Sequence, residues 1–421
     1  MSDSIWNGAT YRHPHDWEQD FPPLTMPQMF ARSVRENGDA PLVDFMGRKF
    51  SYDYLGSRAM QVAAGLIGLG LKPGDRVGLF LPNVPHYIAG YYGAMIAGMT
   101  VVNFSPLYSP AELAHQVEDS GTKLLITVDA KALLPTALKV LKDSSLERLV
   151  VGSVAEALPT AKGIAYRLLK RADIAQIPKD KAVTRWSALV DNDGQLDLPE
   201  AHPDEVALLQ YTGGTTGTPK GAMLTHQSLT ANARQVQLID PGLDPVDRIM
   251  GVLPLFHVFA NTCVLNRTVL RGGEIVMLPR FDAGDALKAI QRTRPVSMPG
   301  VPTMYQALLD HPAIEKTDFT SLKYCISGGA PLTETVKKRW EELTGSTLIE
   351  GYGLTESSGV VSSNPYAREG KIGTIGQPLP GTRIKLLDKE DPSKPAPDGE
   401  PGERPRRADA PAIPRAHPSR T

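Results

Sequence analysis

Alternating strand and helix patterns in the first 150 residues constrain the fold of this chain most. Residues 76–81 carry an almost unbroken apolar run, as expected for a strand that is buried on both faces. Prolines end this run, and the helix that follows is apolar nearly all round, which is typical of a buried helix. The expected elements are strand 76–81, helix 85–98, strand 100–104, helix 110–119 and strand 123–127. Short spacers of this kind predict parallel strands joined by right-handed crossovers.

The same alternation returns after residue 245. The expected strands are 248–253, 274–278, 296–298 and 323–327, and the expected helices are 283–292 and 303–309. After Gly353 the pattern changes to short β segments with Gly and Pro turns, as in 373–385. We therefore predict an α/β fold class with two stacked α/β lobes of mixed, largely parallel sheets, followed by a partial small β-barrel lobe. The predicted domains are 1–200, with a basic insertion at about 155–190, then 201–352, 353–400 and a tail over 401–421.

The bulk composition fits a large soluble enzyme and excludes several other classes. The 421 residues suffice for two or three packed lobes, and the net charge of −1 gives no electrostatic basis for binding nucleic acid. Cys263 and Cys325 are too few for a disulfide framework and lack metal-ligand spacing, so we expect both to be buried structural residues. The polar N-terminus lacks a signal-peptide pattern, and the longest apolar stretch, 87–102, is too short to cross a bilayer. These features predict a cytoplasmic protein.

Two segments differ in character from the rest of the chain. In the insertion at 155–190, Ile164 and Leu168 lie one helical turn apart among several Lys and Arg residues. Such a segment either rests on an anionic membrane surface or forms an ordinary solvated helix, and its composition favours the solvated helix. Residues 401–421 contain five Arg and five Pro, with Ile413 as the one large aliphatic residue, so we expect this tail to be disordered.

The run YTGGTTGTPKG over residues 211–221 is the strongest functional signal. It holds four glycines, four threonines and one lysine, which together supply backbone N–H groups, hydroxyl donors and a mobile cation for a polyphosphate. A Walker A loop is excluded, because that motif needs Gly before the Lys and Ser or Thr after it, whereas Pro219 and Gly221 flank Lys220. A strand-like run over 206–211 precedes the loop. The segment therefore predicts a phosphate-binding site of another kind.

Four further motifs follow in chain order, namely LPLFHVFA at 253–260, PGVPTMY at 299–305, SGGAP at 327–331 and EGYGLTE at 350–356. Together with the loop over 211–221, they resemble the signature of the AMP-forming adenylating enzymes. The resemblance covers about residues 20–400 and is closest to the bacterial long-chain fatty-acid–CoA ligases. It implies a reaction in which a fatty acid and ATP form an acyl-adenylate with release of pyrophosphate. CoA then takes the acyl group, so the resemblance implies ATP, Mg²⁺ and CoA.

The resemblance assigns a role to each motif. Lys220, His257, Thr355 and Glu356 would be catalytic, with His257 orienting the substrate carboxylate and Glu356 holding Mg²⁺. The nucleotide would be bound by Thr212, Gly213, Gly214, Thr215, Thr216, Gly217, Thr218, Lys220, Gly329, Ala330, Pro331, Glu350, Gly351, Tyr352, Gly353 and Thr355. The acyl pocket would be lined by Phe256, His257, Val258, Phe259, Gly300, Val301, Ser327 and Gly328.

The resemblance weakens at the C-terminus. Members of the family continue beyond this point with the rest of the β-lobe and a mobile lid that carries a second lysine. Here the Arg- and Pro-rich tail stands instead, and we expect a frameshift or a truncated reading frame. Three interpretations stay open: an impaired ligase, a half-enzyme that forms only acyl-AMP, and a non-catalytic remnant that binds ATP or fatty acid. The sequence leaves acyl chain length and oligomeric state undetermined, a homodimer included.

Overall fold

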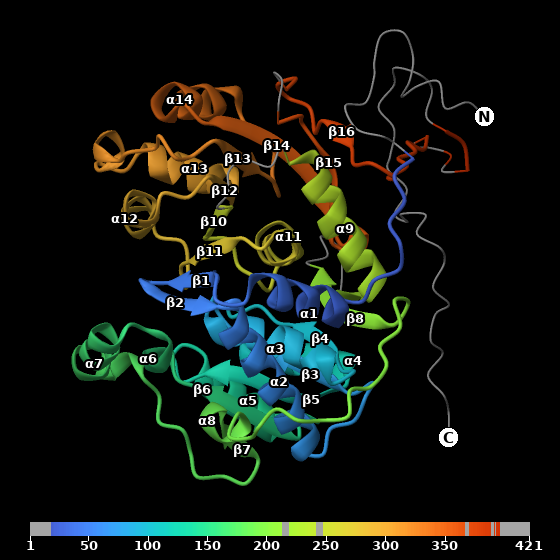
Figure 1. The fold of residues 1–421 in the computed structure, drawn as a ribbon, viewed down its shortest axis with the longest axis vertical. Helices are drawn as coiled ribbons and strands as arrows, with labels where there is room; N and C mark the ends of the chain where they lie inside the picture. Colours follow the sequence, from blue (N-terminus) through green and yellow to red (C-terminus); the bar gives the residue numbers. More distant parts are fainter. Residues whose placement is uncertain are drawn as a thin grey trace.

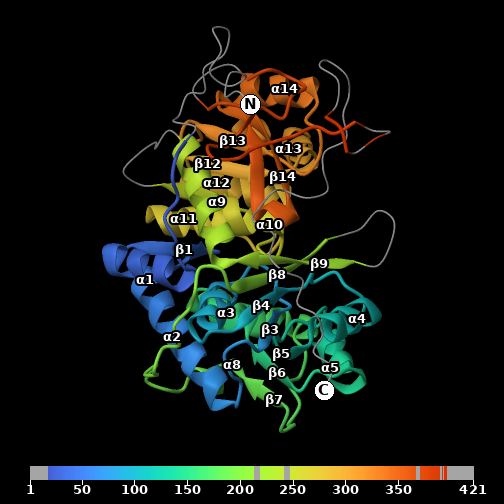
Figure 2. The ribbon, with the colours of Figure 1, turned by 90° about the vertical axis from the view of Figure 1, so that its right-hand side faces the viewer.

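The computed structural model describes residues 18–212, 219–240, 247–366, 370–388, 391 and 393–395. Within these ranges the chain forms two β-sheets, one above the other, with helices between and around them (Figure 1). Figure 2 shows the same two layers from the side, with α1, α9 and the strands β8 and β9 near their boundary. The α/β fold class with two stacked lobes is confirmed. The tail over 401–421, for which we predicted disorder, lies outside the described residues.

The first sheet has seven strands, in the order β7-β6-β5-β3-β4-β8-β9. Every neighbouring pair is parallel except β8 and β9, which form an antiparallel hairpin. The strands are β3 (Arg76–Leu79), β4 (Thr100–Asn103), β5 (Thr122–Val128), β6 (Arg148–Gly152), β7 (Val183–Arg185), β8 (Val206–Thr212) and β9 (Lys220–Thr225). The parallel pairing confirms the parallel strands predicted for the first lobe.

The second sheet has nine strands, in the order β16-β15-β14-β13-β12-β10-β11-β1-β2. Its centre is parallel, and antiparallel pairs close both edges. The strands are β1 (Pro41–Phe45), β2 (Arg48–Ser51), β10 (Arg248–Gly251), β11 (Glu274–Met277), β12 (Ser297–Gly300), β13 (Tyr324–Ser327), β14 (Thr347–Leu354), β15 (Gly359–Ser363) and β16 (Gln377–Pro378).

The helices follow the predicted periodicity, and several begin at recognisable caps. In α4, Ser109 and Glu112 form a reciprocal capping box, Pro110 occupies the first turn, and Gly121 ends the helix in the left-handed region. The helices are α1 (Met26–Asn37), α2 (Tyr52–Gly68), α3 (Pro85–Ile96), α4 (Pro110–Ser120), α5 (Leu134–Asp143), α6 (Val154–Ala157), α7 (Thr160–Leu169), α8 (Trp186–Leu189), α9 (His226–Ile239), α10 (Val258–Ala260), α11 (Arg267–Arg271), α12 (Ala283–Thr293), α13 (Pro302–Leu309) and α14 (Glu334–Thr344). Short 3-10 turns lie at Arg171–Asp173, Ile314–Lys316 and Thr355–Ser357, and Asn261–Asn266 forms a π-helical segment.

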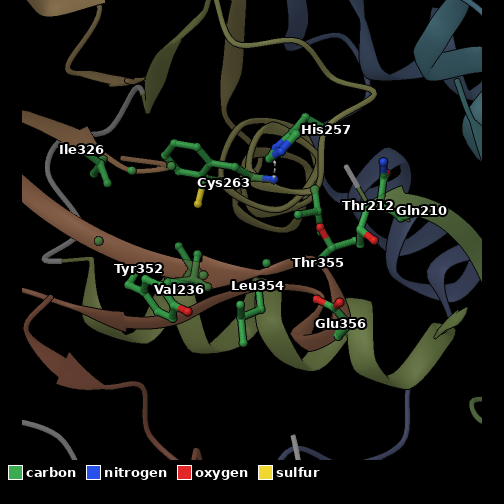
Figure 3. A pocket seen from close by; sticks show the side chains of 18 of the residues that line it. Gln210, Thr212, Val236, His257, Cys263, Ile326, Tyr352, Leu354, Thr355 and Glu356 are labelled. Carbon is green, nitrogen blue, oxygen red and sulfur yellow. Dashed lines mark hydrogen bonds between the residues drawn. The ribbon is translucent and has the colours of Figure 1, made fainter. Parts of the chain in front are cut away.

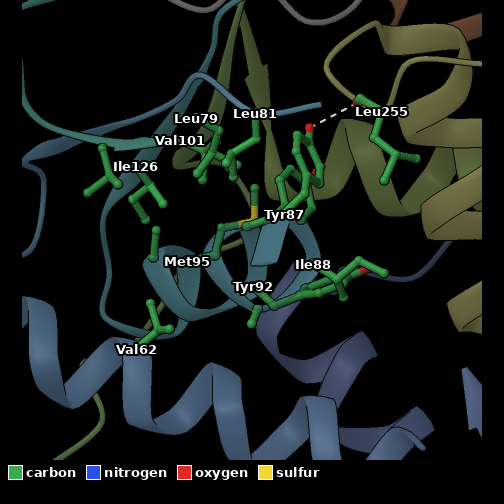
Figure 4. Packing of buried hydrophobic residues seen from close by; sticks show 14 of the residues in the cluster. Val62, Leu79, Leu81, Tyr87, Ile88, Tyr92, Met95, Val101, Ile126 and Leu255 are labelled. Atoms are coloured by element: carbon green, nitrogen blue, oxygen red, sulfur yellow. Dashed lines mark hydrogen bonds between the residues drawn. The ribbon is translucent and has the colours of Figure 1, made fainter. Parts of the chain in front are cut away.

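Helix α3 is the centre of the first core. All twelve of its residues are buried, which confirms the prediction from its apolar surface. Figure 4 shows its side chains packed between α2 and the strands β3, β4 and β5. At Gly93 the α2 backbone comes so close that an added Cβ would lie 2.7 Å from the Ala59 carbonyl oxygen. A side chain there would force the two helices apart.

The two sheets exchange segments across the expected domain boundary at residue 200. Strands β1 and β2 come from the first 60 residues but belong to the second sheet, whereas β8 and β9 complete the first. A continuous hydrophobic core runs across both sheets as a result. The segment after Gly353 was expected to begin a small β-barrel. In the described residues it is instead an antiparallel extension of the second sheet through β14, β15 and β16.

Both cysteines agree with the sequence prediction, because Cys263 and Cys325 are free and buried. None of the helices within the described residues has both the length and the apolar character that crossing a bilayer requires.

Candidate active site

A cavity of about 450 Å³ lies where the two sheets meet. The carboxyl ends of β4 and β8 reach it from the first sheet, and β13, β14 and β15 reach it from the second. Helices α9 and α10 complete its walls (Figure 3). Because parallel α/β sheets bind ligands at the carboxyl ends of their strands, this position is the expected one for a nucleotide.

The β8–β9 hairpin brings Thr212, in the predicted phosphate loop, to this cavity. Thr212 ends β8, pairs with Lys220 across the hairpin and lines the cavity. Its hydroxyl donates to the Lys220 carbonyl at 3.4 Å. The Lys220 side chain is exposed and does not line the cavity. The predicted ligands Gly213, Gly214, Thr215, Thr216, Gly217 and Thr218 lie outside the described residues.

The segment Thr355–Ser357 places a hydroxyl and a carboxylate at the same end of the cavity. This short 3-10 turn follows β14, and Thr355 and Glu356 both line the cavity. Figure 3 shows both side chains near Thr212, on the opposite side of the cavity from Ile326. The described residues hold no cluster of three or more metal-ligating side chains. Glu356 as a single exposed carboxylate nevertheless fits Mg²⁺, which typically binds one or two carboxylates and completes its shell with waters and substrate phosphates.

His257 caps α10 and points into the cavity (Figure 3). Its Nδ1 accepts a hydrogen bond from the Phe259 N–H at 3.3 Å. Desolvation by the surrounding protein lowers the pKa of His257 below its ordinary value, so the neutral ring is favoured. Since Nδ1 is the acceptor, the single proton of the neutral ring lies on Nε2. His257 therefore presents a hydrogen-bond donor to the cavity.

The apolar wall lies beyond His257. Phe256, Val258 and Phe259 line the cavity as predicted, and so does Gly328. The other three predicted pocket residues, Gly300, Val301 and Ser327, are not among the lining residues. Sequence reasoning did not identify the remaining apolar members of this wall, which are Val236, Ile239, Cys263, Ile326, Leu354, Val360 and Tyr366.

The motifs predicted to hold adenine are partly brought together. Gly329, Gly351, Tyr352 and Gly353 line the cavity, whereas Ala330 and Pro331 lie in an exposed turn outside it. At Gly353 an added Cβ would lie 1.9 Å from the Gly359 carbonyl oxygen, so this position admits only glycine without a backbone shift.

Glu350 does not line the cavity. It accepts a hydrogen bond from the Leu332 N–H at 3.3 Å, which fixes the turn that follows β13. Burial raises the pKa of Glu350 above its ordinary value, and the Leu332 hydrogen bond acts in the opposite direction.

A buried polar network reaches the cavity from the first sheet. The Asn103 amide donates to Gln210 Oε1 at 3.1 Å and accepts from the Tyr87 hydroxyl at 2.8 Å. Asn103 and Gln210 line the cavity, and both are polar residues within otherwise apolar strands. That contrast was a usable sequence signal. The other polar lining residues that we did not predict are Ser105, Tyr108, Tyr211 and Ser363.

Asn83 holds the backbone that leads to His257. Its amide donates to the Leu253 carbonyl at 2.8 Å, and its Oδ1 accepts from the Leu255 N–H at 2.8 Å. The Tyr87 hydroxyl contacts the Leu255 carbonyl at 2.9 Å. The first sheet and its helix α3 therefore fix the loop of the second sheet that carries His257.

Comparisons with known proteins agree with this arrangement. The family model "AMP-binding enzyme" matches residues 30–403. The long-chain-fatty-acid–CoA ligase of Bacillus subtilis (strain 168) is 36% identical over 388 residues, which cover 91% of this chain and 69% of that protein. The long-chain-fatty-acid–CoA ligase of Escherichia coli O6:H1 is 38% identical over 409 residues, which cover 93% of this chain and 71% of that protein.

A solved structure of a long-chain-fatty-acid–CoA ligase from Archaeoglobus fulgidus shares the fold. It has a TM-score of 0.78 and 23% sequence identity, and the match covers 93% of this chain and 76% of that one. The chain therefore belongs to the AMP-binding enzyme family.

Proposed function

We propose that this protein activates a long-chain fatty acid with ATP and transfers the acyl group to CoA. One observation carries the proposal: a single cavity has a polar end at Thr212, Thr355 and Glu356, an apolar wall, and His257 between them. A molecule with a phosphate at one end and an alkyl chain at the other fits this order. The relatives at 36% and 38% identity are named for the same reaction.

The proposed reaction has two steps. A carboxylate oxygen of the fatty acid attacks the α-phosphorus of ATP, and the new O–P bond replaces the bond to the β-phosphate oxygen, so pyrophosphate leaves. The CoA sulfur then attacks the acyl carbon, the C–S bond replaces the C–O bond to AMP, and the thiol proton passes to solvent. Catalysis by this route consists of positioning the reactants and neutralising charge.

Individual residues serve these steps. The Nε2–H of His257 donates to a carboxylate oxygen and orients the other oxygen toward phosphorus. The Thr355 hydroxyl donates to the α-phosphate. Lys220 and residues 213–218 would bind the β- and γ-phosphates. Glu356 would hold Mg²⁺, which when bound neutralises charge on the phosphate oxygens. The apolar wall excludes water from the acyl group.

We further propose that the protein works in the cytoplasm and meets its substrate at the inner face of the membrane. Long-chain fatty acids partition into bilayers because each buried CH₂ group contributes about 0.8 kcal/mol. An enzyme that draws on this pool gains from contact with the lipid surface.

Product analysis tests the proposed reaction. Purified protein is incubated with MgATP and palmitate, with and without CoA, and the products are identified by mass spectrometry. Palmitoyl-CoA together with AMP supports the full reaction. Palmitoyl-AMP alone would restrict the chain to the first step. If neither product forms while ATP still binds, the chain is a binding protein and the proposal is wrong.

A further inference from the structure

Helix α7 exposes an unusually apolar surface on the first lobe. Ile164, Leu168 and Leu169 are 55%, 73% and 83% exposed, respectively. Ile164 and Leu168 are one turn apart and therefore share a face of the helix. Arg167, Lys170 and Arg171 lie beside them and are also exposed. We call these six residues the α7 surface.

Helix α7 is held against α6 and the β1–β2 turn at a few points, and Gly163 is its buried residue. An added Cβ at Gly163 would lie 2.6 Å from the Ala155 carbonyl oxygen, which shows how closely α7 approaches α6. Lys162 Nζ donates to the Met46 carbonyl at 2.8 Å, and Arg167 pairs with Glu156 at 3.4 Å. Figure 1 shows α7 at the outer edge of the molecule, beside α6 and away from α9.

The charge around α7 differs in sign from that of the whole chain. Residues 155–190 carry seven Lys and Arg against three Asp and Glu, while the whole chain has a net charge of −1. Arg167 pairs with Glu156 and Lys170 with Asp173 at 3.9 Å, whereas Arg171 makes no ion pair within the described part of the chain. Cations therefore border the exposed leucines without full compensation.

We propose that the α7 surface docks on an anionic lipid bilayer. Leucines bordered by Lys and Arg on one helix face are the pattern of helices that lie in the headgroup region. The leucines enter the acyl boundary, and the nearby cations attract the headgroups of anionic lipid. A protein partner fits less well, because protein interfaces are enriched in aromatic residues and the six residues of the α7 surface include none. This docking rests on the membrane contact proposed above and assigns a surface to it, but it requires no turnover.

Vesicle flotation of the full chain tests the proposal. Wild-type protein should float with vesicles of equal parts phosphatidylglycerol and phosphatidylcholine, and bind pure phosphatidylcholine vesicles much less. The double variant Leu168→Glu/Leu169→Glu should bind the anionic vesicles at least about tenfold more weakly, because two apolar side chains are lost. Arg171→Gln should weaken binding about fivefold, and this effect should shrink at high salt.

Leu198→Glu is the matched control, since Leu198 is 59% exposed and lies outside the α7 surface. It should bind vesicles as the wild type does, and all variants should keep the wild-type melting temperature. Equal binding by the double variant and the Leu198 variant would overturn the proposal. The proposal would also be overturned if the wild type formed a dimer without lipid and the double variant stayed monomeric. The α7 surface would then join two copies of this chain.

Discussion

Replacing Asn83 by alanine tests whether the first sheet positions the catalytic loop of the second. Asn83 is 2% exposed, and its side chain satisfies the Leu253 carbonyl and the Leu255 N–H, both at 2.8 Å. Asn83→Ala removes both partners at once. Each buried backbone group left unsatisfied costs about 1–3 kcal/mol, so we expect a loss of roughly 2–6 kcal/mol in the free energy of unfolding.

The loop should also lose its fixed position relative to the cavity. Because His257 follows Leu255 by two residues, a displaced loop moves the Nε2–H donor away from the substrate carboxylate. We expect kcat/KM for palmitate to fall at least about tenfold, with a smaller change in ATP binding. Urea denaturation measures the first effect, and initial rates of pyrophosphate release measure the second.

Two matched variants sharpen this test. Asn83→Asp keeps the acceptor for the Leu255 N–H but places a second acceptor against the Leu253 carbonyl, so it should be nearly as damaging as alanine. Tyr87→Phe removes the hydroxyl from the Leu255 carbonyl and from Asn103 Oδ1 but leaves both Asn83 hydrogen bonds in place, and it should cost about 1–3 kcal/mol. An Asn83→Ala protein with wild-type stability and wild-type kcat/KM would refute the positioning argument.

Three further predictions concern the cavity itself. Desolvation holds the pKa of His257 below its ordinary value, so the neutral donor form persists as pH falls toward about 6.5 and activity should decline only at lower pH. Profiles of kcat/KM against pH for the wild type and His257→Gln check this. A fall in kcat/KM at alkaline pH that the wild type shows and His257→Gln lacks would contradict it. Gly353→Ala should abolish ATP binding in calorimetry, because its Cβ would overlap the Gly359 carbonyl at 1.9 Å, whereas Gly68→Ala, with no atom within 4 Å, should bind ATP normally. Glu356→Gln should reduce the rate of pyrophosphate release by about 10²–10³ and raise the Mg²⁺ concentration needed for half-maximal rate, and an unchanged Mg²⁺ dependence would remove Glu356 from the metal site.

Much of the fold could be read from the sequence because its strands are short, apolar and separated by clear breaks. The run at 76–81 and the helix after Pro85 follow from burial alone, and the structure places them at β3 and α3. The exchange of β1 and β2 into the second sheet could not be foreseen in this way. It depends on pairing between β1 and β11, whose residues are more than 200 positions apart, and no local pattern encodes such a contact.

In the site, too, residues within sequence motifs were predicted, whereas residues that depend on contacts distant in the sequence were missed. His257, Thr355 and Glu356 were found from their motifs and do line the cavity. Asn83 was missed because its partners at Leu253 and Leu255 lie in the other lobe, and an asparagine after a strand usually marks a turn. Val236 and Cys263 were missed because they lie on α9 and the π-helical segment, which carry no signature of their own.

The most direct test is a crystal structure of this protein with the non-hydrolysable analogue palmitoyl-sulfamoyl-adenosine. We predict that His257 Nε2 lies within about 3 Å of the acyl carbonyl oxygen, with the sulfamoyl group beside Thr355 and the alkyl chain against Val236 and Ile326. An alkyl chain bound outside this cavity, or a sulfamoyl group remote from Thr355, would contradict the assignment of the cavity as the site of adenylation.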